Sequence, residues 1–316
     1  MSLNMNYHSN NIFSSIIIPS YNSERTIVQT LESIFAMKTK YPFETIVVDS
    51  SSDATPTIIE RKFPEVKLIH LEEQTYPGSA RNLGLMYSRG NLVAFVDSDC
   101  IVAEDWLDRM VEAHLKYEYA AIVGSVGNGT PKNLVGWTGY LIEFNEWTPK
   151  TKPRIVKNIL GGNVSYKKER IQKHNLSYTD VFPSEDTIFA WDLQSKGEII
   201  FFDPSIVVYH LNRTNLKILL RHQYILGRAS AQARRTTGLY GKIFTRYPLL
   251  CFGLPFVRFL RAGFRLIKQD IITFLIFMAI SPIYLLCTFS WSVGFVSKGE
   301  FGKTKIKYNH ENKKES

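Results

Sequence analysis

The sequence is poor in cysteine, and its three cysteines suggest neither a metal site nor a disulfide framework. Cys100, Cys251 and Cys287 lie far apart in a chain of 316 residues, whereas metal sites use closely spaced pairs. This usage favours a reducing compartment for the soluble part of the protein. The chain also lacks an internal repeat, and residues 1–13 are polar, without the apolar core of a secretory signal. We expect this N-terminal segment to be flexible.

Acidic residues are almost absent from one part of the chain. Residues 213–270 contain 12 Lys/Arg and one Asp/Glu, whereas residues 1–212 contain more acidic than basic side chains. The sequence therefore predicts an acidic globular part followed by a strongly basic segment. Such a split indicates an anionic partner, either nucleic acid or a phospholipid surface.

Formal charge is then missing altogether from Ile271–Val296, a run of 26 residues rich in Phe, Ile and Leu. A run of this length can cross a bilayer. Just before it, residues 247–267 interleave apolar residues with Arg258, Arg261 and Arg265, the pattern of a basic amphipathic helix in the lipid interface. Membrane phospholipid explains both features and nucleic acid explains only the charge, so we predict membrane attachment and no nucleic-acid partner.

The topology of this C-terminal region follows from its flanking charges. Ser281-Pro282 interrupts the apolar run, and Lys/Arg flank both of its ends. The positive-inside tendency keeps both ends on the cytoplasmic side, which favours a re-entrant or broken hairpin at 269–297 over one straight span. Pairing it with a second span at Leu249–Leu260 is the weaker alternative because of Arg258. We expect 213–268 to be a basic, helical interfacial region and 298–316 a disordered basic tail.

The N-terminal part alternates strand and helix patterns. This alternation predicts an α/β fold with a mixed, mostly parallel sheet and helices on both faces, over residues 14–212. We expect Ser23 to cap the first helix and Gly90 to end the third, and we expect 127–152 to be irregular. Strands are predicted at 15–19, 43–49, 66–71, 92–97, 120–126, 199–202 and 206–209, and helices after Ser23 and at 55–62 and 78–88.

Three of these strands end in polar clusters, PSYN, DSSSD and DSD, and ligands of open α/β sheets bind beyond that edge. The third cluster delivers Asp97 and Asp99 directly from a buried strand. Two neighbouring carboxylates cannot both stay ionised at low cost. A divalent cation would resolve the repulsion, and oxygen ligands suit Mg²⁺ or Mn²⁺. The alternative is an ordinary polar turn, since Asp-Ser-Asp favours turns.

Six segments, taken together and in this order, resemble the family-2 glycosyltransferases, which have the GT-A nucleotide-sugar fold. The resemblance spans residues 14–210 and implies a Rossmann-like glycosyltransferase domain at 14–212. The segments are SIIIPSYNSE (15–24), ETIVVDSSSDAT (44–55), PGSARNLGL (77–85), LVAFVDSDC (92–100), GGNVSYKKE (161–169) and SEDTIFAWDLQSKG (184–197).

The resemblance implies roles on the nucleotide side of the site. Asp99 is expected to coordinate the metal, with His210 completing the metal or diphosphate site unless it is a structural histidine. Asp97 would contact the ribose or support the metal shell, and the metal would neutralise the departing diphosphate. Arg81 is expected to pair with Asp53 or with a phosphate. The full predicted nucleotide-sugar set is Pro19, Tyr21, Asp49, Asp53, Arg81, Asp97 and Ser98.

The resemblance also implies a general base, Asp186, because an acceptor hydroxyl is a poor nucleophile until its proton is removed. Ser184-Glu185-Asp186 reads equally as a helix start with acidic first-turn residues, and both readings are compatible. Family members often have Arg where Asp192 stands, so the surroundings of the base are not predicted. The acceptor or sugar is assigned to Glu185, Gly161, Gly162 and Asn163, because glycine permits close approach of the backbone.

The sequence thus predicts an inverting, metal-dependent glycosyltransferase at the cytoplasmic face of the plasma (inner) membrane. It would move a sugar from a nucleotide-diphosphate sugar to a hydroxyl of a lipid-linked glycan acceptor during surface polysaccharide or glycoprotein glycan assembly. A polyprenyl-phosphate sugar synthase and a non-catalytic membrane scaffold with the same fold are the alternatives. The sugar, base and linkage are left open, because loops such as 127–160 set specificity.

Overall fold

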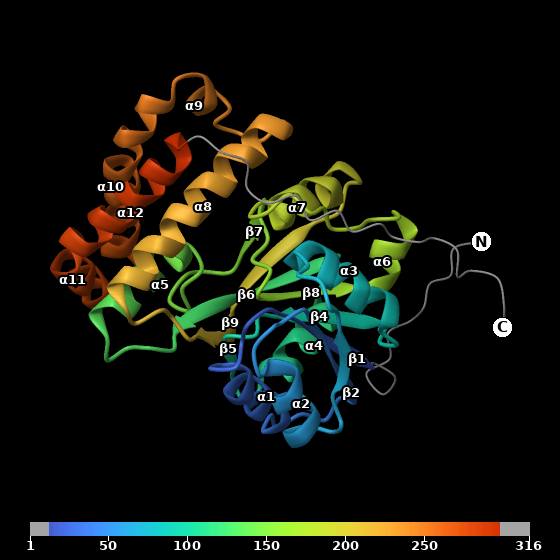
Figure 1. The fold of residues 1–316 in the computed structure, drawn as a ribbon. Coiled ribbons are helices and arrows are strands. Elements are labelled where there is room, and N and C mark those ends of the chain that lie inside the picture. Colours follow the sequence, from blue (N-terminus) through green and yellow to red (C-terminus); the bar gives the residue numbers. More distant parts are fainter. Residues whose placement is uncertain (1–12, 298–316) are drawn as a thin grey trace.

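The computed structural model describes residues 13–297, so the predictions for the tail at 298–316 and for nearly all of 1–13 lie outside the described residues. Within them, one mixed sheet of nine strands has the order β3-β2-β1-β4-β8-β6-β9-β5, with β7 paired to β9 (Figure 1). The strands are β1 (Ser14–Ser20), β2 (Phe43–Asp49), β3 (Lys67–His70), β4 (Leu92–Val96), β5 (Cys100–Val102), β6 (Ala121–Asn128), β7 (Arg154–Val156), β8 (Asn163–Lys167) and β9 (Ile200–His210).

Helices cover both faces of the sheet, and a separate helical layer, α8 to α12, lies beyond its β9 end (Figure 1). The first group is α1 (Ile27–Phe35), α2 (Thr55–Lys62), α3 (Pro77–Tyr87), α4 (Trp106–Lys116), α5 (Leu134–Phe144), α6 (Lys168–Lys173) and α7 (Glu185–Ser195). The second is α8 (Leu216–Thr236), α9 (Ile243–Arg246), the 3₁₀ turn η2 (Pro248–Gly253), α10 (Leu254–Gln269), α11 (Ile271–Ala279) and α12 (Ser281–Val296).

The sheet is buried on both faces, which explains the continuous apolar runs of its central strands. Along β1, Ile16 and Ile18 enter the core on one face while Ile17 enters the core on the other, because successive side chains of a strand alternate. Strands β1, β2, β3 and β4 are mutually parallel, whereas β8 runs antiparallel to β4 and β6. The predicted α/β fold with a mixed, mostly parallel sheet is confirmed.

Several local predictions are wrong. The two strands predicted at 199–202 and 206–209 are one strand, β9 (Ile200–His210). Its pairing with β6 shifts register between Gly124 and Ser125, so a β-bulge and not a strand break accounts for the irregular pattern. The stretch 127–152 contains the helix α5. Ser23 does not cap α1, because its hydroxyl bonds to that of Ser98. Gly90 does not end α3, which stops at Ser88.

The predicted break in the long apolar run is present, since α11 ends at Ala279 and α12 begins at Ser281. In the described part of the chain no single helix is long and apolar enough to cross a membrane. The pair α11 and α12 together has the length and composition, but the pair is bent by 71°. Helix α12 is moreover packed on α8, where Gly227 and Gly294 bring the two backbones together.

The buried histidine of α4 should make the fold sensitive to acid. His114 is 3% exposed, and its Nε2 lies 2.9 Å from the Ser165 hydroxyl. Burial, aided by Lys167, lowers the pKa of His114 to about 3 in the folded protein. In the unfolded chain the pKa of histidine is near 6.5. Between pH 6.5 and pH 3, therefore, the unfolded chain binds a proton at His114 and the folded protein does not. The contribution of His114 to stability is therefore complete above pH 6.5 and falls as the pH decreases towards 3.

We expect His114→Gln to remove this dependence. Between pH 6 and pH 4 the unfolding free energy of the wild type should fall relative to that of the variant by about 1.4 kcal/mol per pH unit, the slope for one proton. Denaturant titrations of both proteins at constant ionic strength measure this difference. Parallel curves for the two proteins would show that His114 titrates normally in the folded state.

Candidate active site

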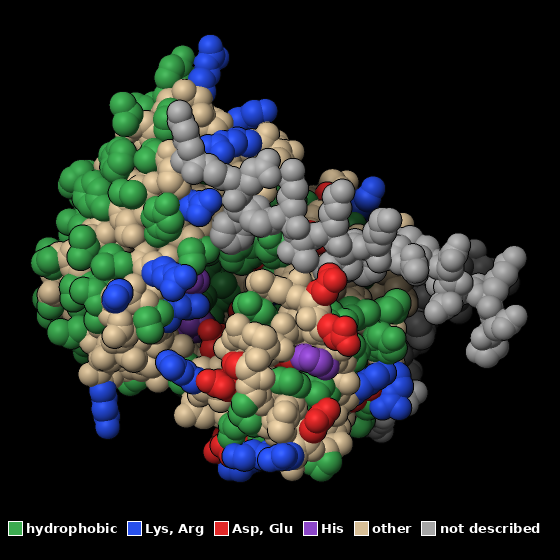
Figure 2. All heavy atoms as spheres, viewed as in Figure 1, with side chains coloured by type: hydrophobic (Ala, Val, Ile, Leu, Met, Phe, Trp, Pro, Cys, Tyr) green, Lys and Arg blue, Asp and Glu red, His purple; other side chains and the backbone are tan. Residues whose placement is uncertain are grey.

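The carboxyl ends of β1, β2 and β4 meet at one edge of the sheet, as predicted from their polar clusters. Asp97 and Asp99 follow β4 there, and β5 pairs with β9 so that Cys100 lies opposite His210. This pairing brings a residue from the end of β9 to the side of Asp99. The side chains of Asp97, Asp99 and Asp186 remain 39%, 29% and 24% exposed, so all three line an open cleft. Figure 2 shows that hollow between the sheet and the helical layer.

One buried cation joins the Asp97 side of the cleft to the helix α7. The Arg81 guanidinium, 3% exposed, lies 3.3 Å from Asp97, 3.3 Å from Glu185 and 3.2 Å from Asp186. Burial alone would lower the pKa of Arg81, but these three carboxylates outweigh it and raise it. Arg81 therefore stays charged and holds three acids from two distant segments at one point.

Arg81 does not hold the pKa values of the neighbouring acids low. The position of Asp97 deep in the cleft, with repulsion from Asp99, outweighs Arg81 and raises the pKa of Asp97 to about 6. Burial and repulsion from Asp186 raise the pKa of Glu185 despite Arg81. Glu185 is 6% exposed. It is therefore a buried partner of Arg81, and its predicted contact with the acceptor or sugar stays a prediction.

Gly161 and Gly162 are required by this cluster, though for a different reason than the one predicted. A Cβ on Gly161 would lie 2.4 Å from both the Arg81 guanidinium and the Asp186 carboxylate, and one on Gly162 would lie 2.3 Å from the Asp97 carboxylate. The Gly161 N–H also donates to Asp186 across 3.1 Å. The glycines thus let the backbone approach the side chains of Arg81, Asp97 and Asp186, and their predicted contact with the sugar or acceptor stays a prediction.

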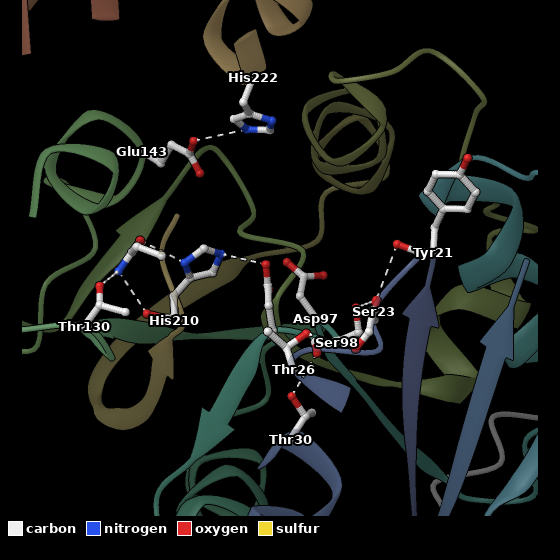
Figure 3. Close-up of polar contacts among 12 residues, drawn as sticks. Tyr21, Ser23, Thr26, Thr30, Asp97, Ser98, Thr130, Glu143, His210 and His222 are labelled. Atoms are coloured by element: carbon white, nitrogen blue, oxygen red, sulfur yellow. Dashed lines mark hydrogen bonds and ion pairs between the residues drawn. The ribbon is translucent and has the colours of Figure 1, made fainter. Parts of the chain in front are cut away.

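Asp99 and His210 form the second half of the cleft, with 3.2 Å between Asp99 Oδ2 and His210 Nε2. Burial would lower the pKa of His210, but Asp99 and Glu143 raise it to about 9. Burial would raise the pKa of Asp99, but His210 and Arg213 lower it. At neutral pH the His210 imidazole is therefore protonated and the Asp99 carboxylate is ionised, and the two form an ion pair. In Figure 3, Asp97 lies between His210 on one side and Ser23 and Tyr21 on the other.

The orientation of the His210 ring is set by a chain of amide contacts. The Thr130 N–H donates to Asn128 Oδ1 across 2.9 Å, and the Asn212 amide N–H₂ donates to the same oxygen, also across 2.9 Å. Asn212 must then present its own oxygen to His210 Nδ1, at 2.9 Å. Nδ1 is thereby the donor, and Nε2 faces Asp99 in the cleft.

These residues fit a divalent cation. The described residues contain no preassembled group of three His, Cys, Asp or Glu side chains that could hold a metal ion. Asp99 and His210 nevertheless offer a carboxylate oxygen and a ring nitrogen, Nε2, 3.2 Å apart. A cation that binds both atoms would displace the proton on Nε2. The fixed Nδ1 donor is the support that a metal-binding histidine normally has. Mg²⁺ and Mn²⁺ sites often complete their shell with substrate phosphates and water.

The predicted nucleotide-side residues divide into exposed and buried ones. Tyr21 is 45% exposed at the end of β1, and Pro19 lies beside Val48 of β2. The Asp49 carboxylate is fully buried, where it accepts bonds from Ser51 and from His70, whose Nδ1 lies 2.8 Å away. A nucleotide would reach Asp49 only by displacing His70. The Ser98 hydroxyl bonds to Ser23 across 2.7 Å, and its carbonyl accepts from Thr30.

Two predicted assignments are wrong. Arg81 does not pair with Asp53, which instead accepts bonds from the backbone of Thr55 and of Glu24 beside α2. Asn163 has no exposed surface. Its amide bonds to the Trp106 indole and to backbone carbonyls of β6 and β9, so it ties the sheet to α4 and does not contact a sugar.

Sequence reasoning missed the opposite wall of the cleft, which α5 and α8 provide. Glu143 lies 3.4 Å from His222 and 3.2 Å from the Gln223 amide (Figure 3). Burial would raise the pKa of Glu143, but His222 and, less strongly, Arg213 lower it; Arg213 also contributes to the lowered pKa of Asp99. The signal was the segment RHQYILGRASAQARR at 221–235, whose polar side chains mark one face of a helix.

The fold and the site together define a class. A mixed α/β sheet with paired carboxylates at the carboxyl end of a central strand, and a further carboxylate from a distant helix in the same cleft, is the arrangement of a nucleotide-sugar-binding GT-A domain. The family model described as Glycosyl transferase family 2 matches residues 15–173. The chain belongs to glycosyl transferase family 2.

Curated relatives match part of the chain. Succinoglycan biosynthesis protein ExoO of Rhizobium meliloti is 39% identical over 99 residues, 31% of this chain and 28% of that protein. Poly(ribitol-phosphate) beta-N-acetylglucosaminyltransferase TarS of Staphylococcus aureus is 27% identical over 221 residues, 66% of this chain and 34% of that protein. The chain thus spans about a third of the length of these relatives.

Solved structures share the fold. The S. aureus TarS 1–349 structure in complex with UDP-GlcNAc aligns with a TM-score of 0.52 at 17% identity and covers 90% of each chain. Mannosyltransferase PcManGT from Pyrobaculum calidifontis, in complex with GDP-Man and Mn²⁺, aligns with a TM-score of 0.52 at 21% identity, covering 84% of this chain and 73% of that one.

Proposed function

We propose that this protein transfers a sugar from a nucleotide-diphosphate sugar to a hydroxyl of a glycan acceptor, with inversion and with Mn²⁺ or Mg²⁺ as cofactor. The observation that carries the proposal is the Arg81 cluster, which holds Asp186 of α7 and Asp97 of the DSD segment within 3.3 Å of one guanidinium. Acids assigned to the two halves of the reaction thus lie in one cleft.

In this reaction Asp186 accepts the proton of the acceptor hydroxyl, whose oxygen attacks the anomeric carbon as the bond from that carbon to the diphosphate oxygen breaks. A single displacement inverts the configuration. Asp99 and His210 would hold the cation, which supplies Lewis-acid stabilisation of the leaving diphosphate when bound. Arg213, whose charge already acts on Asp99, is placed to add a second positive charge there.

The acceptor class follows from relatives by analogy. WfgD of Escherichia coli, 33% identical over 124 residues that make up 39% of this chain and 49% of that protein, is named as a UDP-Glc:alpha-D-GlcNAc-diphosphoundecaprenol beta-1,3-glucosyltransferase. We propose a lipid-linked glycan acceptor in surface polysaccharide assembly for this chain as well.

A panel of nucleotide-sugars tests the proposal. With Mn²⁺ present, one UDP- or GDP-sugar at about 100 times its Kd should stabilise the fold by about 2.7 kcal/mol, seen as a rise in Tm in differential scanning fluorimetry. The same compound should be turned over with release of the nucleoside diphosphate. A panel in which no compound raises Tm would overturn the assignment.

A further inference from the structure

Helix α10 packs Ala262 and Leu266 into the core, and it carries a second apolar stripe that faces away from the protein. In a soluble domain the apolar stripe of a helix faces the core. Here Phe256, Leu260, Phe264 and Ile267 recur every three or four residues, and each is about half exposed or more, up to 67% for Phe264. The side turned inward carries Arg265, which bonds to Asn145 and Glu146 on the sheet side.

The exposed stripe continues into the neighbouring elements. Ile271, Ile272, Leu275 and Met278 of α11 are 56%, 63%, 61% and 45% exposed. Before α10, Leu249 of η2 is 77% exposed. Figure 2 shows hydrophobic side chains gathered over this part of the helical layer. We call the surface made by these residues and by the α10 stripe the apolar face. Monomeric soluble proteins rarely expose an apolar surface of this extent without a partner.

The charges next to the apolar face identify the partner. Lys242, Arg246, Arg261 and Lys268 are exposed beside it, whereas Asp270, the one acidic residue of 213–270, is paired with Lys150 across 2.8 Å. Tyr240 and Tyr247, 83% and 51% exposed, are aromatic residues of the kind found at the lipid headgroup level. Arg261 also lies 4.0 Å from Glu146. Apolar side chains rimmed by a group of exposed cations match an anionic bilayer surface.

The same geometry excludes a simple crossing by this region. Helix α11 has nine residues, about 14 Å at 1.5 Å per residue, against about 30 Å for the hydrocarbon core. Helix α12 packs on α8 and η2, since the Ser290 hydroxyl donates to the Leu220 carbonyl of α8 and the Ser292 hydroxyl donates to the Cys251 carbonyl of η2. Neither helix is free to span.

We propose that the apolar face docks the protein in the plane of an anionic phospholipid bilayer, with α10 and α11 inserted at the level of the headgroups and no segment of 213–297 crossing. Such docking does not depend on the proposed sugar transfer, because a non-catalytic protein with this surface would bind lipid equally well.

Flotation of the full chain with vesicles tests the docking. The wild type should float with vesicles of phosphatidylcholine containing about a third phosphatidylglycerol, near the anionic content that attracts basic surfaces. The double variant Leu260→Gln/Phe264→Gln should lose at least tenfold in binding. The matched control Met86→Gln/Ile155→Gln changes residues of similar exposure, 68% and 62%, on α3 and β7 and should bind as the wild type does.

The charge is tested separately. Lys242→Gln/Arg246→Gln should weaken binding to anionic vesicles severalfold and leave binding to pure phosphatidylcholine unchanged. Equal flotation of the wild type and Leu260→Gln/Phe264→Gln would overturn the proposal. The proposal would also be overturned if the wild type did not bind vesicles but formed a dimer, and if Leu260→Gln/Phe264→Gln converted that dimer to a monomer. The partner of the apolar face would then be a second copy of the chain. None of these measurements uses a nucleotide-sugar. Failure of the docking proposal can therefore be distinguished from failure of the proposed sugar transfer.

Discussion

Replacing Asp186 by Asn should lower the rate of sugar transfer about 10³-fold, within the range for loss of a general base. Asn keeps the size of the side chain and can still accept the Gly161 N–H, now 3.1 Å from the carboxylate. The cluster around Arg81 should therefore persist, and the dissociation constant of the nucleotide-sugar should stay within a few-fold. Release of nucleoside diphosphate in the presence of acceptor gives the rate, and calorimetry gives the affinity.

Asp192→Asn is the matched control, because Asp192 lies on the same helix, α7, but is exposed, and this change should leave both quantities as they are. Normal turnover in Asp186→Asn would remove Asp186 as the base. It would favour a polyprenyl-phosphate sugar synthase, whose acceptor is a phosphate that needs no deprotonation.

Chelation of divalent cations should reduce transfer to the background rate, and added Mn²⁺ or Mg²⁺ should restore it. The reason is that Asp99 and His210 Nε2, 3.2 Å apart, otherwise stabilise only each other and leave the diphosphate without its main counter-charge. Asp99→Ala should lose at least 10²-fold in rate and should not recover at the cation concentration that saturates the wild type. Rates measured after EDTA treatment and metal titration provide the check.

Asp105→Asn serves as the control for this series, since Asp105 is exposed and pairs with Arg109 at the start of α4. Its metal dependence should equal that of the wild type. Full activity of the wild type in EDTA would show that Arg213 and the protein dipoles alone stabilise the leaving group.

The sheet was predictable because its strands carry their own signals. The continuous apolar runs at Ile16–Ile18 and Leu92–Val96 are buried on both faces, and the polar residues after them mark the edge where ligands bind. Asp97 and Asp99 could be selected from that pattern alone. The β-bulge opposite Gly124 was hidden, because a register shift depends on the partner strand and leaves no periodic trace in its own sequence.

The partners of the site residues were not predictable, since they join segments far apart in the chain. Arg81 lies 104 residues from Glu185, and nothing near either residue shows that they meet. Asn163 was misassigned because its neighbours Gly161 and Gly162 do belong to the site, while its own amide points into the core. The apolar pattern of 247–267 predicted an interfacial helix, but it did not show that Ala262 and Leu266 of α10 pack inward, because an amphipathic pattern alone does not say which residues face the protein.

The crossing of α8 and α12 leaves no room for even one added methyl group. A Cβ on Gly227 would lie 2.0 Å from the Trp291 carbonyl, and one on Gly294 would lie 2.0 Å from that of Tyr224. The two helices are therefore in contact along their backbones at this crossing. Since α8 carries His222 and α12 adjoins α10 and α11, docking of the outer helices on a bilayer, as proposed above, would also set the orientation of the cleft relative to that surface.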